Sequence, residues 1–199
     1  RPEVLVFRGS RDVTLLALET GETLWDWTSP PSSNNVLCRF LPTGSGLRLV
    51  TFPNYSTLGI CFDFSGNARK PRTVWKEDYA GRFTKGYGPS FVLADMDGDR
   101  TVDLLLSSKL EGDPGRGSLY QAVIDPASGE VKAEGHLVPE PAAPLPLGRP
   151  YGFLETADLD GDGRREIVLV SCQVEEYACV SRLDGAGGIR KLWAHFVEK

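Results

Sequence analysis

Two acidic stretches of this chain have the residue types and the spacing of a site for a hard divalent cation. Each contains an Asp-x-Asp-Gly-Asp core, and each has a further acid four residues after the last Asp. In the first stretch the expected ligands are the side chains of Asp95, Asp97, Asp99 and Asp103 and the backbone carbonyl of Thr101. In the second they are the side chains of Asp158, Asp160, Asp162 and Glu166 and the backbone carbonyl of Arg164.

The chemistry that these residues support is calcium binding. Ca²⁺ takes about six to eight oxygen ligands, and acids at alternate loop positions can turn inward around one ion. Gly98 and Gly161 allow the sharp turn between the acids. Without a cation, the carboxylates of one loop would repel one another. We therefore expect two Ca²⁺ sites, with Mg²⁺ as the alternative metal. An acidic surface turn that binds nothing is the simpler alternative, and the repetition of the loop argues against it.

The residues that flank the two loops predict strands. Runs such as Leu104-Leu-Leu and Ile167-Val-Leu-Val are short, apolar and bounded by turn residues. An EF-hand would need a helix on each side and a Glu at its twelfth position, so that motif is excluded. The sequence places each metal in a hairpin between two strands. All the ligands of a site come from one loop, which leaves little room for a substrate, and we expect structural ions.

The whole chain repeats a unit of four short strands. Trp25, Trp75 and Trp193 recur on the last strand of a unit, after a turn that contains Gly. Repetition of this kind indicates β-propeller blades, whereas a two-layer sandwich, the alternative fold, explains neither the repeated Trp nor the repeated loop. The predicted fold is all-β, a single propeller segment of antiparallel meanders. The expected blades cover residues 1–28 (incomplete), 35–77, 90–137 and 151–199.

The two loops and their flanking strands resemble the FG-GAP repeats of integrin-α-type β-propellers and their VCBS relatives. In both loops the Gly precedes the third Asp, and Glu166 replaces a final Asp, which are departures from the family pattern. The resemblance implies a calcium-binding, secreted propeller of about seven blades. Glu3 aligns with Glu166, so the first blade is expected to lack its inner strand. The remaining blades would come from the same or a second polypeptide.

The composition excludes several classes of partner and indicates a cellular location. A net charge of −5 gives no basic surface for nucleic acid, and no apolar run reaches the ~20 residues of a membrane helix. Asn54-Tyr55-Ser56 is a glycosylation sequon, so we expect a glycoprotein that is extracellular or in the lumen of the secretory pathway. Cys38 and Cys61 are expected to be buried thiols, whereas Cys172 and Cys179 allow a cross-strand disulfide.

The sequence favours a binding module over an enzyme, without deciding between them. Long connectors gather on the face opposite the acidic loops, where exposed aromatic and basic side chains would bind a protein or carbohydrate ligand. These side chains are Tyr55, Tyr79, Arg82, Phe83, Lys85, Tyr87, Arg116, Arg149 and Tyr151. The alternative for each is that it packs its loop against the blades. A second alternative is the scaffold of a carbohydrate lyase or dehydratase, for which Glu155, on an inner strand, is the one catalytic candidate. His136 and His195 lie on expected outer strands, away from the axis.

Overall fold

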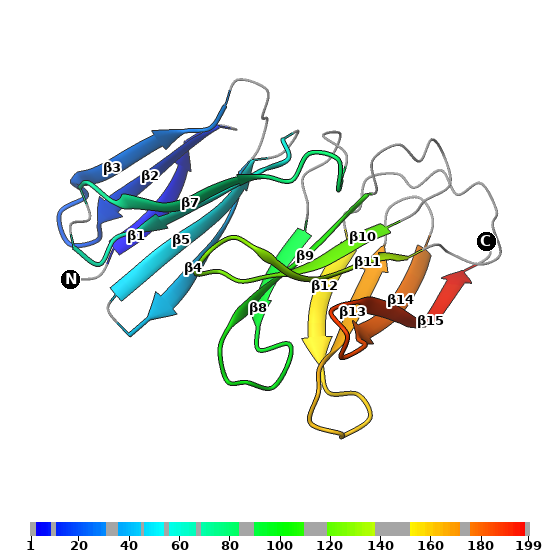
Figure 1. The fold of residues 1–199 in the computed structure, drawn as a ribbon. Helices are drawn as coiled ribbons and strands as arrows, with labels where there is room; N and C mark the ends of the chain where they lie inside the picture. The colour runs from blue at the N-terminus through cyan, green and yellow to red at the C-terminus, as the bar shows by residue number, and fades with distance from the viewer. Residues whose placement is uncertain are drawn as a thin grey trace.

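The computed structural model describes residues 3–8, 11–30, 36–44, 46–53, 56–66, 69–83, 90–109, 119–137, 152–171 and 176–197. These residues form fifteen strands in four sheets, which we call blades 1 to 4 (Figure 1). Within this part of the chain there is no helix of the length and apolarity that crossing a bilayer requires.

Blade 1 contains β1 (Glu3–Arg8), β2 (Asp12–Ala17) and β3 (Thr23–Thr28). Blade 2 contains β4 (Val36–Thr43), β5 (Gly46–Pro53), β6 (Leu58–Asp63) and β7 (Arg72–Asp78). Blade 3 contains β8 (Ser90–Ala94), β9 (Asp103–Lys109), β10 (Leu119–Ile124) and β11 (Val131–Leu137). Blade 4 contains β12 (Gly152–Ala157), β13 (Glu166–Ser171), β14 (Glu176–Leu183) and β15 (Ile189–Val197).

Every blade is an antiparallel meander in which each strand pairs with the next one along the chain. This confirms the predicted all-β fold. The first strands of neighbouring blades lie side by side, with β8 between β4 and β12. They form the inner side of the arrangement. Blade 1 has three described strands, and their register identifies them as the second, third and outer strands of a blade.

The outer strand of every blade carries a β-bulge at the same place. The register shifts between Leu15 and Leu16, Cys61 and Phe62, Val123 and Ile124, and Val180 and Ser181. One extra residue stands opposite each shift. The four extra residues are Leu24, Val74, Lys132 and Leu192. Bulges of this kind re-aim a side chain, which matters for Lys132 below.

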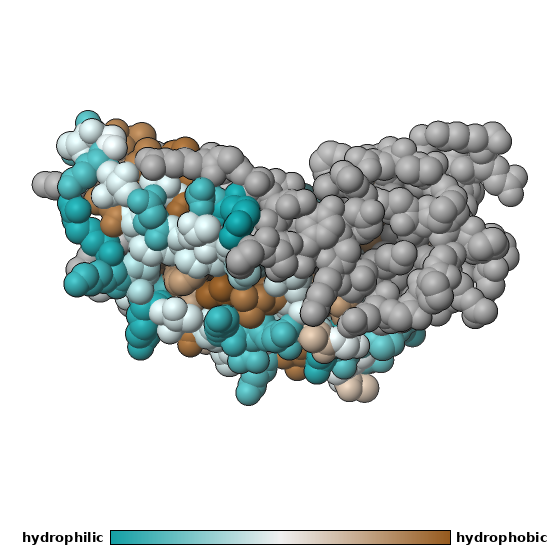
Figure 2. Space-filling view, turned by 90° about the horizontal axis from the view of Figure 1, so that it is seen from above, coloured by the Kyte–Doolittle hydropathy of each residue, from teal (hydrophilic) through white to brown (hydrophobic). Residues whose placement is uncertain are grey.

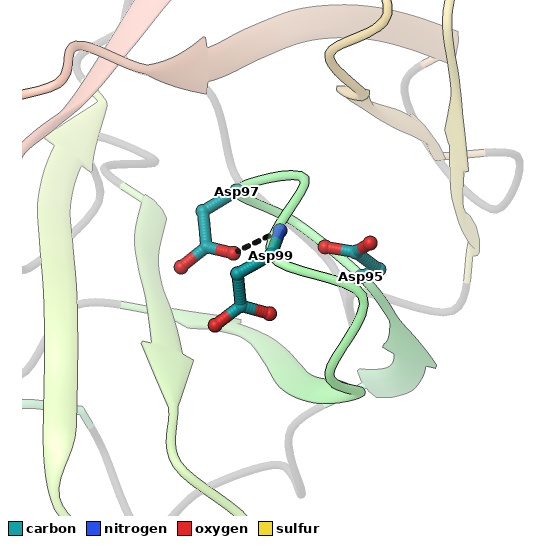
Figure 3. Close-up of side chains that lie close together, drawn as sticks. All are labelled: Asp95, Asp97 and Asp99. Atoms are coloured by element: carbon teal, nitrogen blue, oxygen red, sulfur yellow. Dashed lines mark hydrogen bonds between the residues drawn. The ribbon is translucent and has the colours of Figure 1, made fainter.

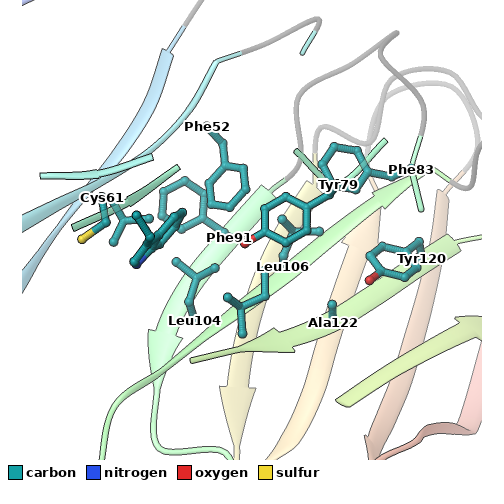
Figure 4. Packing of buried hydrophobic residues seen from close by; sticks show 12 residues of the cluster. Phe52, Cys61, Tyr79, Phe83, Phe91, Leu104, Leu106, Tyr120 and Ala122 are labelled. Atoms are coloured by element: carbon teal, nitrogen blue, oxygen red, sulfur yellow. The ribbon is translucent and has the colours of Figure 1, made fainter. Parts of the chain in front are cut away.

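The hydrophobic core lies between blades rather than inside any one of them. Blades 2 and 3 share a cluster that includes Phe52, Tyr79, Phe83, Phe91 and Tyr120 (Figure 4). A second cluster lies between blades 3 and 4, and a third joins blade 1 to blade 2. The central strands of blade 3 are covered by blade 2 on one side and blade 4 on the other, which explains why Leu104, Leu105 and Leu106 are all buried.

The cysteines of the described residues are reduced and buried. Cys38 and Cys61 lie on β4 and β6, with β5 between them, which confirms that they are apolar core residues. Cys179 does not form the disulfide that the sequence allows with Cys172. It is a free thiol inside the cluster between blades 3 and 4. Cys172 lies outside the described residues. Burial raises the pKa of Cys38 to about 12 and the pKa of Cys61 and Cys179 to about 11, so these thiols are poor nucleophiles.

Candidate metal centre

The two acidic loops connect the first and second strands of blades 3 and 4 and extend from the same face (Figure 1). They share one backbone conformation. Asp95 accepts hydrogen bonds from the amides of Gly98 (2.8 Å) and Arg100 (2.9 Å). Asp158 accepts the equivalent bonds from Gly161 (2.7 Å) and Gly163 (3.0 Å). The repeated sequence therefore folds into a repeated loop.

Glycine and one arginine make the turn of these loops possible. Gly98 has φ 82° and Gly161 has φ 77°, in the left-handed region that glycine adopts without strain. The residues two positions later, Arg100 and Gly163, also have positive φ, at 69° and 84°. Arg100 is the one non-glycine residue of the described chain in that region. The first loop thus keeps its conformation at some cost in backbone strain.

A buried acid on the second strand of the blade accepts a hydrogen bond from each loop. Asp103 and Glu166 are 1% and 2% exposed. In each case one carboxylate oxygen accepts the amide of the loop's second residue: Met96 to Asp103 Oδ2 at 3.1 Å, and Leu159 to Glu166 Oε2 at 2.8 Å. The second oxygen of each acid, Asp103 Oδ1 and Glu166 Oε1, is not used by the loop amides.

The structure brings three of the predicted ligands of each loop together. Oxygen atoms of Asp95, Asp97 and Asp99 lie within 4.8 Å of one another in the first loop, where the three carboxylates lie side by side (Figure 3). Oxygen atoms of Asp158, Asp160 and Glu166 do so in the second. Asp103 is not in the first group and Asp162 is not in the second. The loop spacing predicts the same role for these two acids as for their neighbours, and each of them shares a basic side chain with a member of its group.

Asp99, which belongs to the first group, and Asp162, which is outside the second, also organise the turns of their own loops. Asp99 accepts hydrogen bonds from the Thr101 hydroxyl at 2.5 Å and the Thr101 amide at 2.7 Å, and these bonds hold the pKa of Asp99 below its ordinary value. Asp162 accepts the Arg164 amide at 2.8 Å. Thr101 and Arg164, expected as carbonyl ligands, therefore contact these acids through their amide nitrogens.

Two basic side chains that the loop pattern does not reveal reach into the loops. Lys132 Nζ lies 2.7 Å from Asp103 Oδ1 and 3.0 Å from Asp97 Oδ2. Partial burial alone would lower the pKa of Lys132, but its hydrogen bonds to Asp103 and Asp97 raise that pKa above the ordinary value. Burial raises the pKa of Asp103, and the bonds from Lys132 and the Met96 amide oppose that rise.

In the second loop the basic residue is Arg182, on β14. Its Nη1 lies 3.2 Å from Asp160 Oδ2, 3.5 Å from Asp162 Oδ2 and 3.6 Å from Glu166 Oε1. The last separation is too long for a hydrogen bond. Within the described part of the chain, Glu166 Oε1 is a buried oxygen with no hydrogen-bond partner. A buried carboxylate oxygen in this state is costly, and it faces a group of acids that suits a hard cation.

The other functional candidates divide between described and undescribed residues. Glu155 lies on β12 opposite Val168, with an exposed side chain, and His136 and His195 lie on the outer strands β11 and β15. The loop residues Tyr55, Lys85, Tyr87, Arg116, Arg149 and Tyr151 lie outside the described residues, as does much of the face opposite the acidic loops (grey in Figure 2).

The expectation that Tyr79 and Phe83 are exposed binding residues is wrong. Both are buried, at 5% and 0% exposure, and their rings stack in the cluster between blades 2 and 3 (Figure 4). The Tyr79 hydroxyl donates to the carbonyl of Gly129 at 2.7 Å, and Arg82 pairs with Glu134. Tyr79, Arg82 and Phe83 therefore pack the connector after blade 2 against blade 3, which is the alternative role stated for them.

Comparison with known proteins identifies the fold and no family. No family model matches the chain, and no curated protein matches it. Among solved structures it is similar to the C-terminal domain of Pseudomonas aeruginosa PilY1, with a TM-score of 0.55 and 12% identity over 92% of this chain and 37% of that one. It is also similar to the Bacillus licheniformis rhamnogalacturonan lyase PL11, with a TM-score of 0.51 and 12% identity over 95% and 43%.

A second lyase, rhamnogalacturonan lyase YesW, gives a TM-score of 0.50 and 16% identity over 97% of this chain and 44% of the lyase. The chain therefore spans less than half the length of each of these three structures. At such identities the similarity concerns the fold alone. These neighbours and the four meandering blades make the chain an all-β protein of propeller-like architecture.

Proposed function

We propose that the chain is a cation-stabilised propeller module that binds a protein or carbohydrate ligand, and that the cation is Ca²⁺ or Mg²⁺. The observation that carries the proposal is the Glu166 oxygen Oε1, which is buried near Asp158 and Asp160 and has no hydrogen-bond partner among the described residues. A divalent ion there would supply the ligand contact that Oε1 lacks, and it would fix the loop in its folded conformation. The loop pattern also supports kinship with FG-GAP repeats.

A melt tests the metal. Adding CaCl₂ to EDTA-treated protein is expected to raise Tm, since an ion that binds only the folded state stabilises it by about 1.4 kcal/mol at tenfold excess over Kd. Glu166→Gln should remove most of the response, whereas Glu19→Gln, at an exposed turn of blade 1, should keep it. Wild-type melts that coincide with and without EDTA would exclude a stabilising ion.

The exposed side of blade 4 supports a proposal about partners. Met96 of blade 3 is 2% exposed because blade 4 covers it, in a cluster with Leu154 and Ile167. Leu159 occupies the same loop position in blade 4 and is 58% exposed. We propose that a further blade, from the same or a second polypeptide, covers Leu159 as blade 4 covers Met96. The sequon at Asn54 supports an extracellular or secretory-lumen location for such an assembly.

The alternative function is a carbohydrate-lyase-type scaffold, and the rhamnogalacturonan lyases among the structural neighbours favour it. If the chain contributes to such chemistry, Glu155→Gln should abolish turnover of a rhamnogalacturonan while Tm stays unchanged, because the Glu155 side chain is exposed. The readout is the ultraviolet absorbance of the unsaturated product. Cleavage at the wild-type rate would remove Glu155 from consideration, and polysaccharide binding without cleavage would favour the binding module.

A further inference from the structure

The two acidic loops differ in the hydrogen bonding of the second oxygen of their buried acid. Their backbones and their amide hydrogen bonds match, and each buried acid directs one oxygen to the amide of the loop's second residue. In the second loop the remaining oxygen, Glu166 Oε1, has no hydrogen-bond partner among the described residues. In the first loop the remaining oxygen, Asp103 Oδ1, accepts a hydrogen bond from Lys132 Nζ at 2.7 Å.

The position of Lys132 in the blade is the reason that it reaches the loop. Lys132 is the extra residue of the bulge in β11, between Val131 and Ala133. The extra residue is Leu24 in blade 1, Val74 in blade 2 and Leu192 in blade 4. Among the four described bulges, a charged side chain stands at this position only in blade 3, beside an acidic loop.

The ammonium also bridges the two parts of the first site. It contacts the buried Asp103 and, at 3.0 Å, the exposed Asp97 of the loop tip. A divalent ion that joined the loop acids to Asp103 would need the space that Lys132 Nζ fills. Because both carry positive charge, a divalent ion bound there and the Lys132 ammonium would repel each other.

Arg182 does not fill the second site in this way. Its closest contact is Asp160 Oδ2 at 3.2 Å, at an exposed part of the loop tip, and it leaves the buried oxygen of Glu166 without a hydrogen bond. Arg182 Nη1 also approaches Asp162 Oδ2, at 3.5 Å, and Glu166 Oε1, at 3.6 Å. The distance to Glu166, 3.6 Å, is 0.9 Å longer than that of Lys132 Nζ to Asp103 Oδ1, 2.7 Å. With Arg182 in place, Glu166 Oε1 still has no hydrogen-bond partner among the described residues, whereas Asp103 Oδ1 in the first loop has one.

We propose that the Lys132 ammonium is the built-in cation of the first loop, and that only the second loop binds a divalent ion. This inference rests on the proposed metal function of the second loop. The sequence predicts two equivalent metal sites. The inference gives one metal site, in the second loop, and one ion pair between Lys132 and Asp103, in a first loop with the same backbone conformation. Blade 3 then keeps its hairpin when calcium is removed, while blade 4 depends on the ion.

The number of bound Ca²⁺ ions tests the inference, measured by equilibrium dialysis or by native mass spectrometry of the intact chain. Wild type should bind one ion and Glu166→Gln none. Lys132→Leu, which installs the residue type of the blade 4 bulge, should bind two. The double variant should bind one, now in the first loop. Lys76→Leu, which removes an exposed lysine from β7, makes the same charge change and should leave the count at one.

The outcomes separate the two proposals. If wild type binds no ion and Lys132→Leu binds none, the proposed metal function fails. If wild type binds two ions, or if Glu166→Gln retains its single ion, the metal function stands and the role of Lys132 is overturned. The wild-type and Glu166→Gln counts alone decide whether the second loop is the only one that binds an ion, so a folding defect in Lys132→Leu cannot hide that answer. A folded Lys132→Leu variant that binds one ion would overturn the role of Lys132.

Discussion

Replacing Trp75 by alanine is expected to lower the free energy of unfolding by roughly 3–5 kcal/mol, the usual cost of truncating a buried large aromatic side chain. Trp75 is 6% exposed and belongs to the cluster between blades 2 and 3. Its Nε1 donates to the carbonyl of Pro126 at 3.0 Å, and Gly129 leaves room for its ring. The variant would therefore lose the contacts that join two blades. Urea unfolding followed by tryptophan fluorescence or circular dichroism measures the loss.

Trp193 provides the matched control for Trp75. Both residues face the third strand at the bulge of their blades, Trp75 opposite Cys61 and Trp193 opposite Val180. Trp193 is 51% exposed, so Trp193→Ala should cost much less in this chain. Equal losses for the two variants would contradict the view that contact between blades, rather than the strand position, gives Trp75 its effect. Trp75→Phe should fall between the two, since it keeps a ring but leaves the Pro126 carbonyl unpaired.

The features that the sequence predicts well are local ones. The turn of each acidic loop is fixed by residues a few positions apart, because Asp95 and Asp158 bind amides of their own loops. The strand pattern is local too, since apolar runs such as 104–106 repeat with each blade. The recurrence of Trp25, Trp75 and Trp193 on outer strands is confirmed for the same reason: one register of the bulge places all three.

The features that the sequence does not predict depend on contacts between segments that are far apart in the chain. Lys132 meets the first loop from the outer strand of its blade, and a spacing pattern confined to the loop contains no sign of it. A charged residue at a position that is apolar in the other blades is the signal that would have found it. The connector sequence alone favours a binding face for Tyr79 and Phe83, whereas their burial depends on blade 3.

The same reasoning explains why the sequence predicts two equivalent loops. Their ligand residues match in type and order, and the structure confirms that their backbones match. What differs is how closely a basic side chain approaches the buried acid: Lys132 of β11 lies 2.7 Å from Asp103, whereas Arg182 of β14 lies 3.6 Å from Glu166. A loop motif therefore predicts the backbone of the loop more reliably than the basic side chains that reach it from other strands.

Gly135→Ala is expected to destabilise the contact between blades 3 and 4 by about 1–3 kcal/mol or more, the cost of overpacking at a site that cannot relax. A Cβ atom at Gly135 would lie 2.3 Å from the carbonyl oxygen of Ile189 and 2.8 Å from its Cβ. Because the nearest atom belongs to the backbone, a change of rotamer cannot remove the clash. The strand β15 would have to move away from β11, where the amide of Glu134 donates to Gly187 at 3.2 Å. Gly44→Ala is the control, since no described atom lies within 4 Å of the place that its added methyl group would take. Equal urea midpoints for the two variants would contradict the prediction. They would mean that β11 and β15 do not pack as closely at Gly135 as the structure shows.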